Sequence, residues 1–288
     1  MAGKRNNTLL KAAALTTAFS AGYLYYENNR IEVNYYALHS DRGSGVRLLQ
    51  LSDLHDKVLG NGNKRLLDKI KKIKPDIILL TGDTVSTGGK NLKATCAFLR
   101  RLTASYLVVG ILGNHEQRGD AQDRIESAML GAGVDLLKNE NKVYDIRGTK
   151  VSVLGLCEKQ ALKRSDYIKA FFNLLSYENH DEELLKLEES CGIRLLLSHF
   201  PENYALTGPS AYNRYSFELM LSGHAHGGQI RLPVLGGIYA PGQGFFPKYC
   251  KGIYPNRKNA LLVSGGIGND GPCPRVNNPP SLAVVDFI

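Results

Sequence analysis

The chain of 288 residues is long enough for a substantial core, and its 43% hydrophobic and 22% charged residues exclude a disordered or fibrous protein. A net charge of +9 favours an anionic partner, such as nucleic acid, lipid headgroups or a phosphorylated substrate, without choosing among them. Five cysteines, an odd number without a C-x-x-C pair, argue against a disulfide framework and against a thiolate metal site.

Residues 1–30 differ from the rest of the chain. Lys4, Arg5 and Lys11 precede an uncharged, largely apolar stretch at 12–26. This pattern predicts a secretory signal or a membrane anchor, and the alternative is a helix with no membrane role. An anchor would leave the basic end in the cytoplasm and the body on the extracytoplasmic side, associated with the membrane. The unpaired cysteines instead favour the cytoplasmic face.

Residues 31–288 show no linker and are expected to form a single domain. Apolar runs predict buried strands at 46–51, 77–80, 106–112, 193–197, 217–221, 260–263 and 282–287, and a hairpin at 142–156. Helical spacing of apolar residues predicts helices at 63–74, 92–102, 121–130 and 182–189. The alternation of strand and helix in the first half indicates an α/β fold with a parallel sheet and covering helices.

Asp, Asn or His residues directly follow five of these predicted strands. The segments are Ser52-Asp53-Leu54-His55, Thr81-Gly82-Asp83, Gly113-Asn114-His115-Glu116, Ser198-His199 and Ser222-Gly223-His224-Ala225-His226. Each segment alone is explained by an ordinary turn, but open α/β sheets gather ligands at the carboxyl ends of their strands. Carboxylate, amide and imidazole donors without a thiol suit Mn²⁺, Fe or Zn²⁺. The sequence therefore predicts one metal site built from several loops.

These segments together resemble the calcineurin-like metallophosphoesterases. The stretch L-S-G-H-A-H-G-G-Q-I-R-L-P at 221–233, K-G-I-Y at 251–254 and P-R-V-N-N-P at 274–279 further resemble a bacterial branch of small single-domain phosphodiesterases, often with an N-terminal signal or anchor. The resemblance implies a four-layer αββα sandwich of two mixed sheets flanked by helices. It also implies two divalent metal ions at the edge between the sheets.

The resemblance assigns roles to individual residues. Asp53, His55 and His226 would hold the first metal, Asn114, His199 and His224 the second, and Asp83 would bridge both. His115 would stand near the leaving-group oxygen with Glu116 orienting it. Apart from the resemblance, Arg118, Arg231 and Arg275 lie near these motifs and either steer phosphate or are ordinary surface arginines. Two ions ~3.5–4 Å apart can share a hydroxide and clamp the phosphoryl oxygens, which predicts hydrolysis of a phosphodiester or pyrophosphate.

The natural substrate is left open by the sequence. A small phosphoester, a lipid-linked nucleotide of the UDP-2,3-diacylglucosamine type cleaved at its pyrophosphate, and a nucleic acid are the alternatives within hydrolysis. A scaffold that kept the fold without catalysis is the alternative of another class. The aromatic residues at 236–254 form either a hydrophobic cover over the site that accepts a lipid or a base, or a packed irregular loop.

Overall fold

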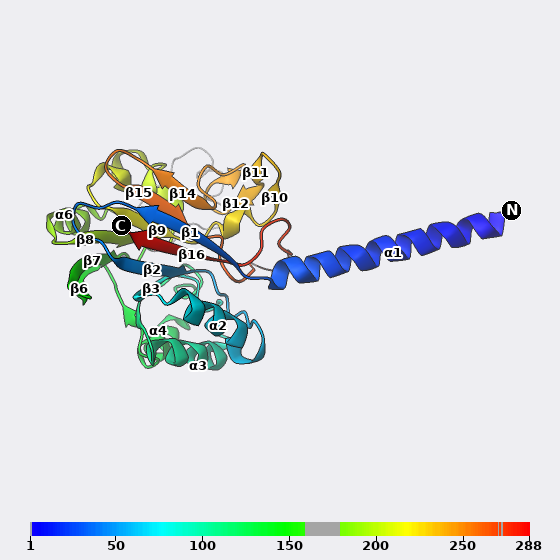
Figure 1. Ribbon diagram of the computed structural model, residues 1–288, viewed down its shortest axis with the longest axis horizontal. Coiled ribbons are helices and arrows are strands. Elements are labelled where there is room, and N and C mark those ends of the chain that lie inside the picture. The colour runs from blue at the N-terminus through cyan, green and yellow to red at the C-terminus, as the bar shows by residue number, and fades with distance from the viewer. Residues whose placement is uncertain (1, 159–178, 270, 272) are drawn as a thin grey trace.

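Two six-stranded sheets lie face to face in the computed structural model, which describes residues 2–158, 179–269, 271 and 273–288 (Figure 1). The first sheet has the order β1 (Glu32–Leu38), β16 (Ser281–Phe287), β2 (Val46–Leu51), β3 (Ile77–Thr81), β4 (Leu107–Ile111) and β5 (Asp135–Leu136). The second has the order β14 (Gly252–Pro255), β15 (Ala260–Val263), β9 (Leu219–Ser222), β8 (Ile193–Leu197), β7 (Thr149–Gly155) and β6 (Glu140–Ile146).

Helices cover the outer faces of both sheets. The helices α2 (Lys64–Ile73), α3 (Leu92–Thr103) and α4 (Gln122–Leu130) pack on the first sheet, and α6 (Asp181–Glu189) packs on the second. Short hairpins, β10 (Arg231–Leu232) with β11 (Gly236–Gly237) and β12 (Tyr239–Ala240) with β13 (Gly244–Phe245), follow β9. The predicted four-layer αββα arrangement is confirmed.

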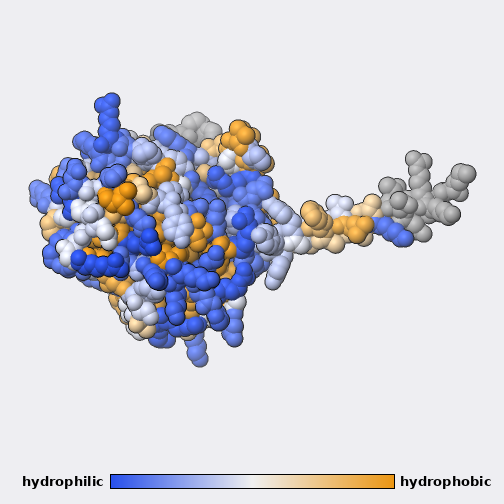
Figure 2. Space-filling view, in the orientation of Figure 1, coloured by the Kyte–Doolittle hydropathy of each residue, from blue (hydrophilic) through white to orange (hydrophobic). Residues whose placement is uncertain are grey.

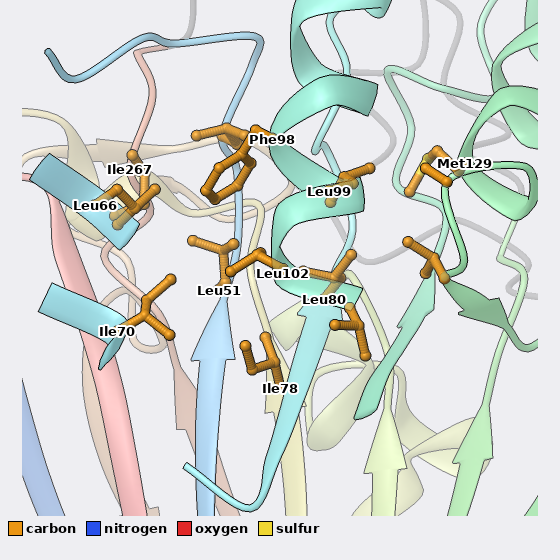
Figure 3. Packing of buried hydrophobic residues seen from close by; sticks show 14 of the residues in the cluster. Leu51, Leu66, Ile70, Ile78, Leu80, Phe98, Leu99, Leu102, Met129 and Ile267 are labelled. Carbon is orange, nitrogen blue, oxygen red and sulfur yellow. The ribbon is translucent and has the colours of Figure 1, made fainter. Parts of the chain in front are cut away.

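The strand β3 is apolar at four of its five positions because both of its faces are buried. In β3, Ile77 and Leu79 point into the core between the two sheets, whereas Ile78 and Leu80 face the helices. Figure 3 shows Ile78 and Leu80 beside Leu102 of α3 on the helix side. Side chains alternate across a strand with a period of two, so one continuous apolar run supplies two cores.

Both sheets are mixed rather than parallel throughout. The strands β2, β3 and β4 are parallel, as predicted, and the short β5, which was not predicted, extends them in parallel, but β16 runs antiparallel to β2. The strand β1, which the sequence pattern did not reveal, pairs in parallel with β16 at the edge of the sheet. Its side chains are only partly buried, so β1 has no continuous apolar run.

The helix α1 (Ala2–Asn29) projects away from the body, and only its last turns contact it (Figure 1). Tyr23 donates to Asn277 Oδ1 at 2.6 Å. Asn28 makes a paired contact with the backbone of Arg275, accepting from its N–H and donating to its carbonyl oxygen. Among the described residues, no helix combines the length and the apolarity required to cross a membrane.

Candidate active site

The loops that follow β2, β3, β4, β8 and β9 meet at one edge of the sandwich. The amide of Asp53 donates to the carbonyl oxygen of Gly82 at 3.0 Å, which joins two loops of the first sheet. Asp53 Oδ1 accepts from the amide of His224 at 2.9 Å, which joins the two sheets. Beneath them, the buried side chain of Gln50 donates to Thr81 Oγ1 and to the carbonyl oxygen of Ser222. The structure thus brings together segments 171 positions apart in the chain.

Asp53, His55 and His226 form the first group of side chains that could hold a metal ion. The Nε2 atoms of His55 and His226 lie 3.1 Å apart, and the two rings are stacked. Asp53 Oδ2 is buried and has no hydrogen-bond partner among the described residues. A buried carboxylate oxygen without a donor is costly unless a cation balances its charge, so this group fits a divalent ion.

Asp83, His199 and His224 form a second such group. The His199 Nε2 atom lies 3.3 Å from Asp83 Oδ2 and 3.1 Å from Asn114 Oδ1. Its other ring nitrogen, Nδ1, lies 2.8 Å from the carbonyl oxygen of Thr81. Donation from Nδ1 to that carbonyl directs Nε2 toward the group, as in known metal sites. His224 Nε2 is buried without a partner among the described residues, which also fits a metal ligand.

Asp83 lies between the two groups. A further cluster of ligand atoms contains Asp83, His55 and His115, so Asp83 is close to histidines from both groups. Burial alone would raise the pKa of the Asp83 carboxyl, but the charge of His199 beside it holds that pKa well below the usual range. Burial would likewise lower the pKa of His199, but Asp83 raises it to about 10. The carboxylate of Asp83 is therefore the anionic centre of the site.

The other two buried histidines of the ligand groups are held neutral. Burial lowers the pKa of His224 well below the ordinary value, and the nearby charge of His199 adds to the effect. Burial also lowers the pKa of His226. Because a metal ion binds the neutral form of imidazole, these two side chains need lose no proton when an ion arrives.

Five of these residues adopt backbone conformations that side chains rarely take. They have positive φ angles, which are 50° for Asp53, 46° for His55, 51° for Asp83, 66° for His224 and 47° for His226. Each such conformation costs on the order of 1–3 kcal/mol and persists only where the surroundings enforce it. Strain of this kind concentrates at functional sites.

Gly113 and Gly223 allow the loops to pack this closely. A side-chain carbon on Gly113 would overlap the carboxylate of Asp83, and one on Gly223 would overlap Ser52 Oγ. Both positions therefore require glycine for a steric reason. Gly227 and Gly228, by contrast, have positive φ angles of 66° and 80° in the turn that aims His226.

His115 lies at the opening of the site rather than in its buried wall. Its ring packs edge-on against that of His55 with centroids 4.6 Å apart, and its Nδ1 lies 3.0 Å from Thr87 Oγ1. The amide of His115 donates to Asp83 Oδ1 at 2.8 Å. The structure therefore places the partly exposed side chain of His115 beside the ligand groups.

The resemblance implies that Glu116 orients His115, but in the structure the Glu116 carboxylate accepts hydrogen bonds from backbone amides instead. The Glu116 carboxylate is fully buried and accepts from the backbone amides of Asp83, Val85 and Gly113 at 2.8–3.0 Å. Three amide donors occupy this carboxylate, so it holds the loops after β3 and β4 together. Burial, and then the charge of Asp83, raise the pKa of Glu116 to about 8. We therefore correct its role to positioning of the Asp83 backbone.

Two of the three arginines expected to steer phosphate have other partners. Arg275 is fully buried and donates to the carbonyl oxygens of Gly265 and Gly268, and its Nη2 lies 3.3 Å from His226 Nδ1. Arg231 donates to the carbonyl oxygen of Gly227. Arg275 therefore cannot contact a substrate; it holds His226 from behind, and Arg231 supports the same turn.

Arg118 remains a suitable contact for an anionic substrate. Its side chain is exposed, and its positive charge contributes to the lowered pKa of His224. It follows the loop after β4, close to His115 in the sequence. Of the three arginines, Arg118 is the exposed one, and its role toward a substrate stays a prediction.

Glu158 is a functional residue that sequence reasoning missed. It follows β7, and its buried carboxylate accepts from the amide of His199 at 3.0 Å and from the side chains of Ser198, Asn203 and Tyr212. Glu158 thereby fixes the loop that carries His199. The signal was present in the sequence, because Glu158 stands just beyond an apolar run, as the other site residues do.

Glu202, behind the same loop, makes stability depend on pH. Burial raises the pKa of its carboxyl from 4.5 to about 7. Between these values the folded chain holds a proton that the unfolded chain releases, so the free energy of unfolding falls as pH rises through this window, by on the order of 1–3 kcal/mol. Glu202→Gln stays neutral, so thermal unfolding at pH 4.5 and pH 8 should show a smaller fall than in the wild type, the remainder coming from Glu116, whose pKa is also raised.

The matched control is Glu189→Gln, which changes an exposed glutamate at the end of α6. It should keep the wild-type dependence on pH. An identical dependence in Glu202→Gln and in the wild type would show that Glu202 is not the group responsible.

Known proteins are similar to this chain in sequence. The family model of the calcineurin-like phosphoesterases matches residues 46–228. An uncharacterized metallophosphoesterase of Bacillus subtilis, YkuE, is 28% identical over 90% of this chain and 86% of its own length. The phosphodiesterase YaeI of Escherichia coli is 24% identical over the full length of both chains. The solved structure of the phosphopantetheinyl hydrolase PptH of Mycobacterium tuberculosis covers 78% of this chain and 91% of its own at 16% identity, with a TM-score of 0.46. This chain belongs to the calcineurin-like phosphoesterase family and is thereby a hydrolase of phosphate esters.

Proposed function

We propose that the chain is a phosphodiesterase that works with two divalent metal ions. The observation that carries the proposal is the pair of ligand groups, Asp53–His55–His226 and Asp83–His199–His224, with Asp83 close to both. Bound there, two ions would polarise the phosphoryl oxygens and make water nucleophilic near neutral pH. The mixed oxygen and imidazole donors suit Mn²⁺, Fe or Zn²⁺.

The ligand set also suits an anionic substrate. Asp53 and Asp83 carry the two carboxylates of the ligand groups, and the remaining donors, histidines and Asn114, add no negative charge. Two carboxylates do not cancel the charge of two divalent ions, so the loaded site stays positive and attracts a phosphoester. Exposed Arg118 adds a positive charge at the opening. His115, also at the opening, is placed to give a proton to the departing oxygen.

The activity is tested with chromogenic esters and added Mn²⁺. We expect the full chain to hydrolyse bis-p-nitrophenyl phosphate, a diester, and thymidine 5′-monophosphate p-nitrophenyl ester faster than p-nitrophenyl phosphate, a monoester. A preference for the monoester would contradict the phosphodiesterase proposal. Failure to hydrolyse any ester with any of the three metals would favour the non-catalytic scaffold, although the complete ligand groups argue against that alternative.

We further propose that α1 brings the protein to a membrane surface, with the body on the extracytoplasmic side. Lys4, Arg5 and Lys11 lie at the start of this helix, and Leu15 and Phe19 are 72% and 78% exposed. Basic and exposed apolar residues on one helix favour an anionic lipid surface.

Vesicles test this membrane proposal. The full chain should sediment with phosphatidylglycerol vesicles at low salt, and Phe19→Asp should reduce the bound fraction several-fold. The control Tyr35→Asp changes an exposed aromatic residue of β1 and should bind as the wild type does. Equal sedimentation with and without vesicles would refute the association.

A further inference from the structure

An apolar pocket opens beside the first ligand group. It has a volume of about 280 Å³, near the lower end of the range for small-molecule sites. His226, a member of that ligand group, forms part of its wall together with Ile230, Ile238, Tyr239 and Pro241. Because a ligand histidine belongs to the wall, a phosphoryl group held at the ligands would have one of its substituents next to this pocket.

The pocket continues into exposed apolar surface. The Tyr239 ring packs edge-on against Phe245 with centroids 5.5 Å apart, and Phe245 is 74% exposed. On the neighbouring hairpin the four consecutive residues 232–235 are all exposed, and Val234 at its tip is fully so. We call residues 232–235, 245 and 246 the apolar lip. Figure 2 shows apolar surface on the half of the body from which α1 projects, where Figure 1 places these hairpins. Exposed apolar runs of this length are rare without a binding role.

One polar group in the pocket wall lacks a partner. Gln229 donates through Nε2 to the carbonyl oxygen of Cys273, while its Oε1 is buried without a partner among the described residues. A buried acceptor left unpaired is costly, so it favours a ligand with one hydroxyl or amide N–H near the phosphate.

We propose that this pocket and the apolar lip bind the apolar chain of a phosphodiester, one whose esterified alcohol carries a long alkyl group. The inference rests on the proposed phosphodiesterase function and names the substrate class of that site. A nucleobase fits the same wall poorly, because its several polar edge atoms would face Ile230, Ile238 and Pro241. An alkyl chain has no polar atoms to leave unpaired there, and its transfer from water into the pocket is favourable.

A chain-length series with one leaving group tests the proposal. The substrates are the methyl, butyl and octyl diesters of p-nitrophenyl phosphate, all used below micelle-forming concentrations with the full metal-loaded chain. Each buried methylene is worth about a fourfold gain in affinity. Partial burial of the octyl chain therefore predicts a kcat/KM on the order of 10² times that of the methyl diester. Equal values for the octyl and methyl diesters would overturn the proposal.

A substitution in the pocket wall tests whether the pocket causes the dependence of kcat/KM on chain length. Ile238→Ser should reduce the octyl-to-methyl ratio about tenfold. The control Leu185→Ser makes a similar change at a half-exposed position on α6 and should leave the ratio unchanged. Should Ile238→Ser not fold, the wild-type series still decides the question, because it needs no variant.

The possible failures are distinguishable. If no diester in the series is hydrolysed, methyl included, the proposed function itself fails. If all are hydrolysed at one rate, the function stands and the pocket proposal fails. A higher kcat/KM for the thymidine ester than for the octyl diester would replace the alkyl chain with a nucleotide as the occupant.

Discussion

Asp83→Asn is expected to lower kcat/KM for bis-p-nitrophenyl phosphate by at least on the order of 10³-fold and to reduce the metal bound per chain. Asp83 contributes an oxygen within reach of histidines from both ligand groups, and its carboxylate is the anionic centre of the site. Asparagine keeps the shape but removes the charge. A bound metal ion supplies several kcal/mol of transition-state stabilisation, and each 1.4 kcal/mol is about tenfold in rate.

The matched control for this prediction is Asp68→Asn, an exposed aspartate of α2 that pairs with Lys64. It should retain both metal content and activity. Activity in Asp83→Asn within tenfold of the wild type would show that Asp83 does not join the two groups. Elemental analysis of both variants, alongside the rates, separates loss of metal from loss of fold.

His115→Ala is expected to keep its metal but to lose turnover in a way that depends on the leaving group. A side chain that donates a proton to the departing oxygen contributes roughly 10²–10⁴-fold. Phenoxide needs that proton far more than p-nitrophenoxide does. The loss should therefore be larger for diphenyl phosphate than for bis-p-nitrophenyl phosphate, as paired values of kcat would show.

Two further variants test whether the loss is specific to His115. His39→Ala changes an exposed histidine before β2 and should be as active as the wild type. Thr87→Val removes the hydroxyl beside His115 Nδ1 and should produce a smaller loss with the same preference. If His115→Ala instead loses metal, His115 is a ligand, in keeping with its place near His55 and Asp83.

Most of the sandwich could be predicted because its central strands are buried on both faces. The strand β8 fills two cores with one apolar run, and its predicted bounds, 193–197, coincide with the observed ones. The strand β1 could not be predicted in this way. It lies at a sheet edge with partly exposed side chains, and its partner β16 stands at the opposite end of the chain.

The candidate ligands could be predicted from their positions at strand ends, but the roles of neighbouring polar residues could not. Glu116 follows His115 in sequence, yet its carboxylate turns to backbone amides of two loops. Arg275 lies near a motif, yet it is buried behind His226 and contacts the end of α1 through its backbone. Such roles depend on which distant segments pack together, and the local sequence does not reveal that packing.

The metal content of the full chain is the most direct test of the proposed two-metal site. After loading with Mn²⁺ and removal of excess ion, elemental analysis should find two ions per chain, and chelation followed by readdition should abolish and then restore hydrolysis of bis-p-nitrophenyl phosphate. One ion per chain or none, or hydrolysis that survives complete removal of metal, would contradict a two-metal site built on Asp83.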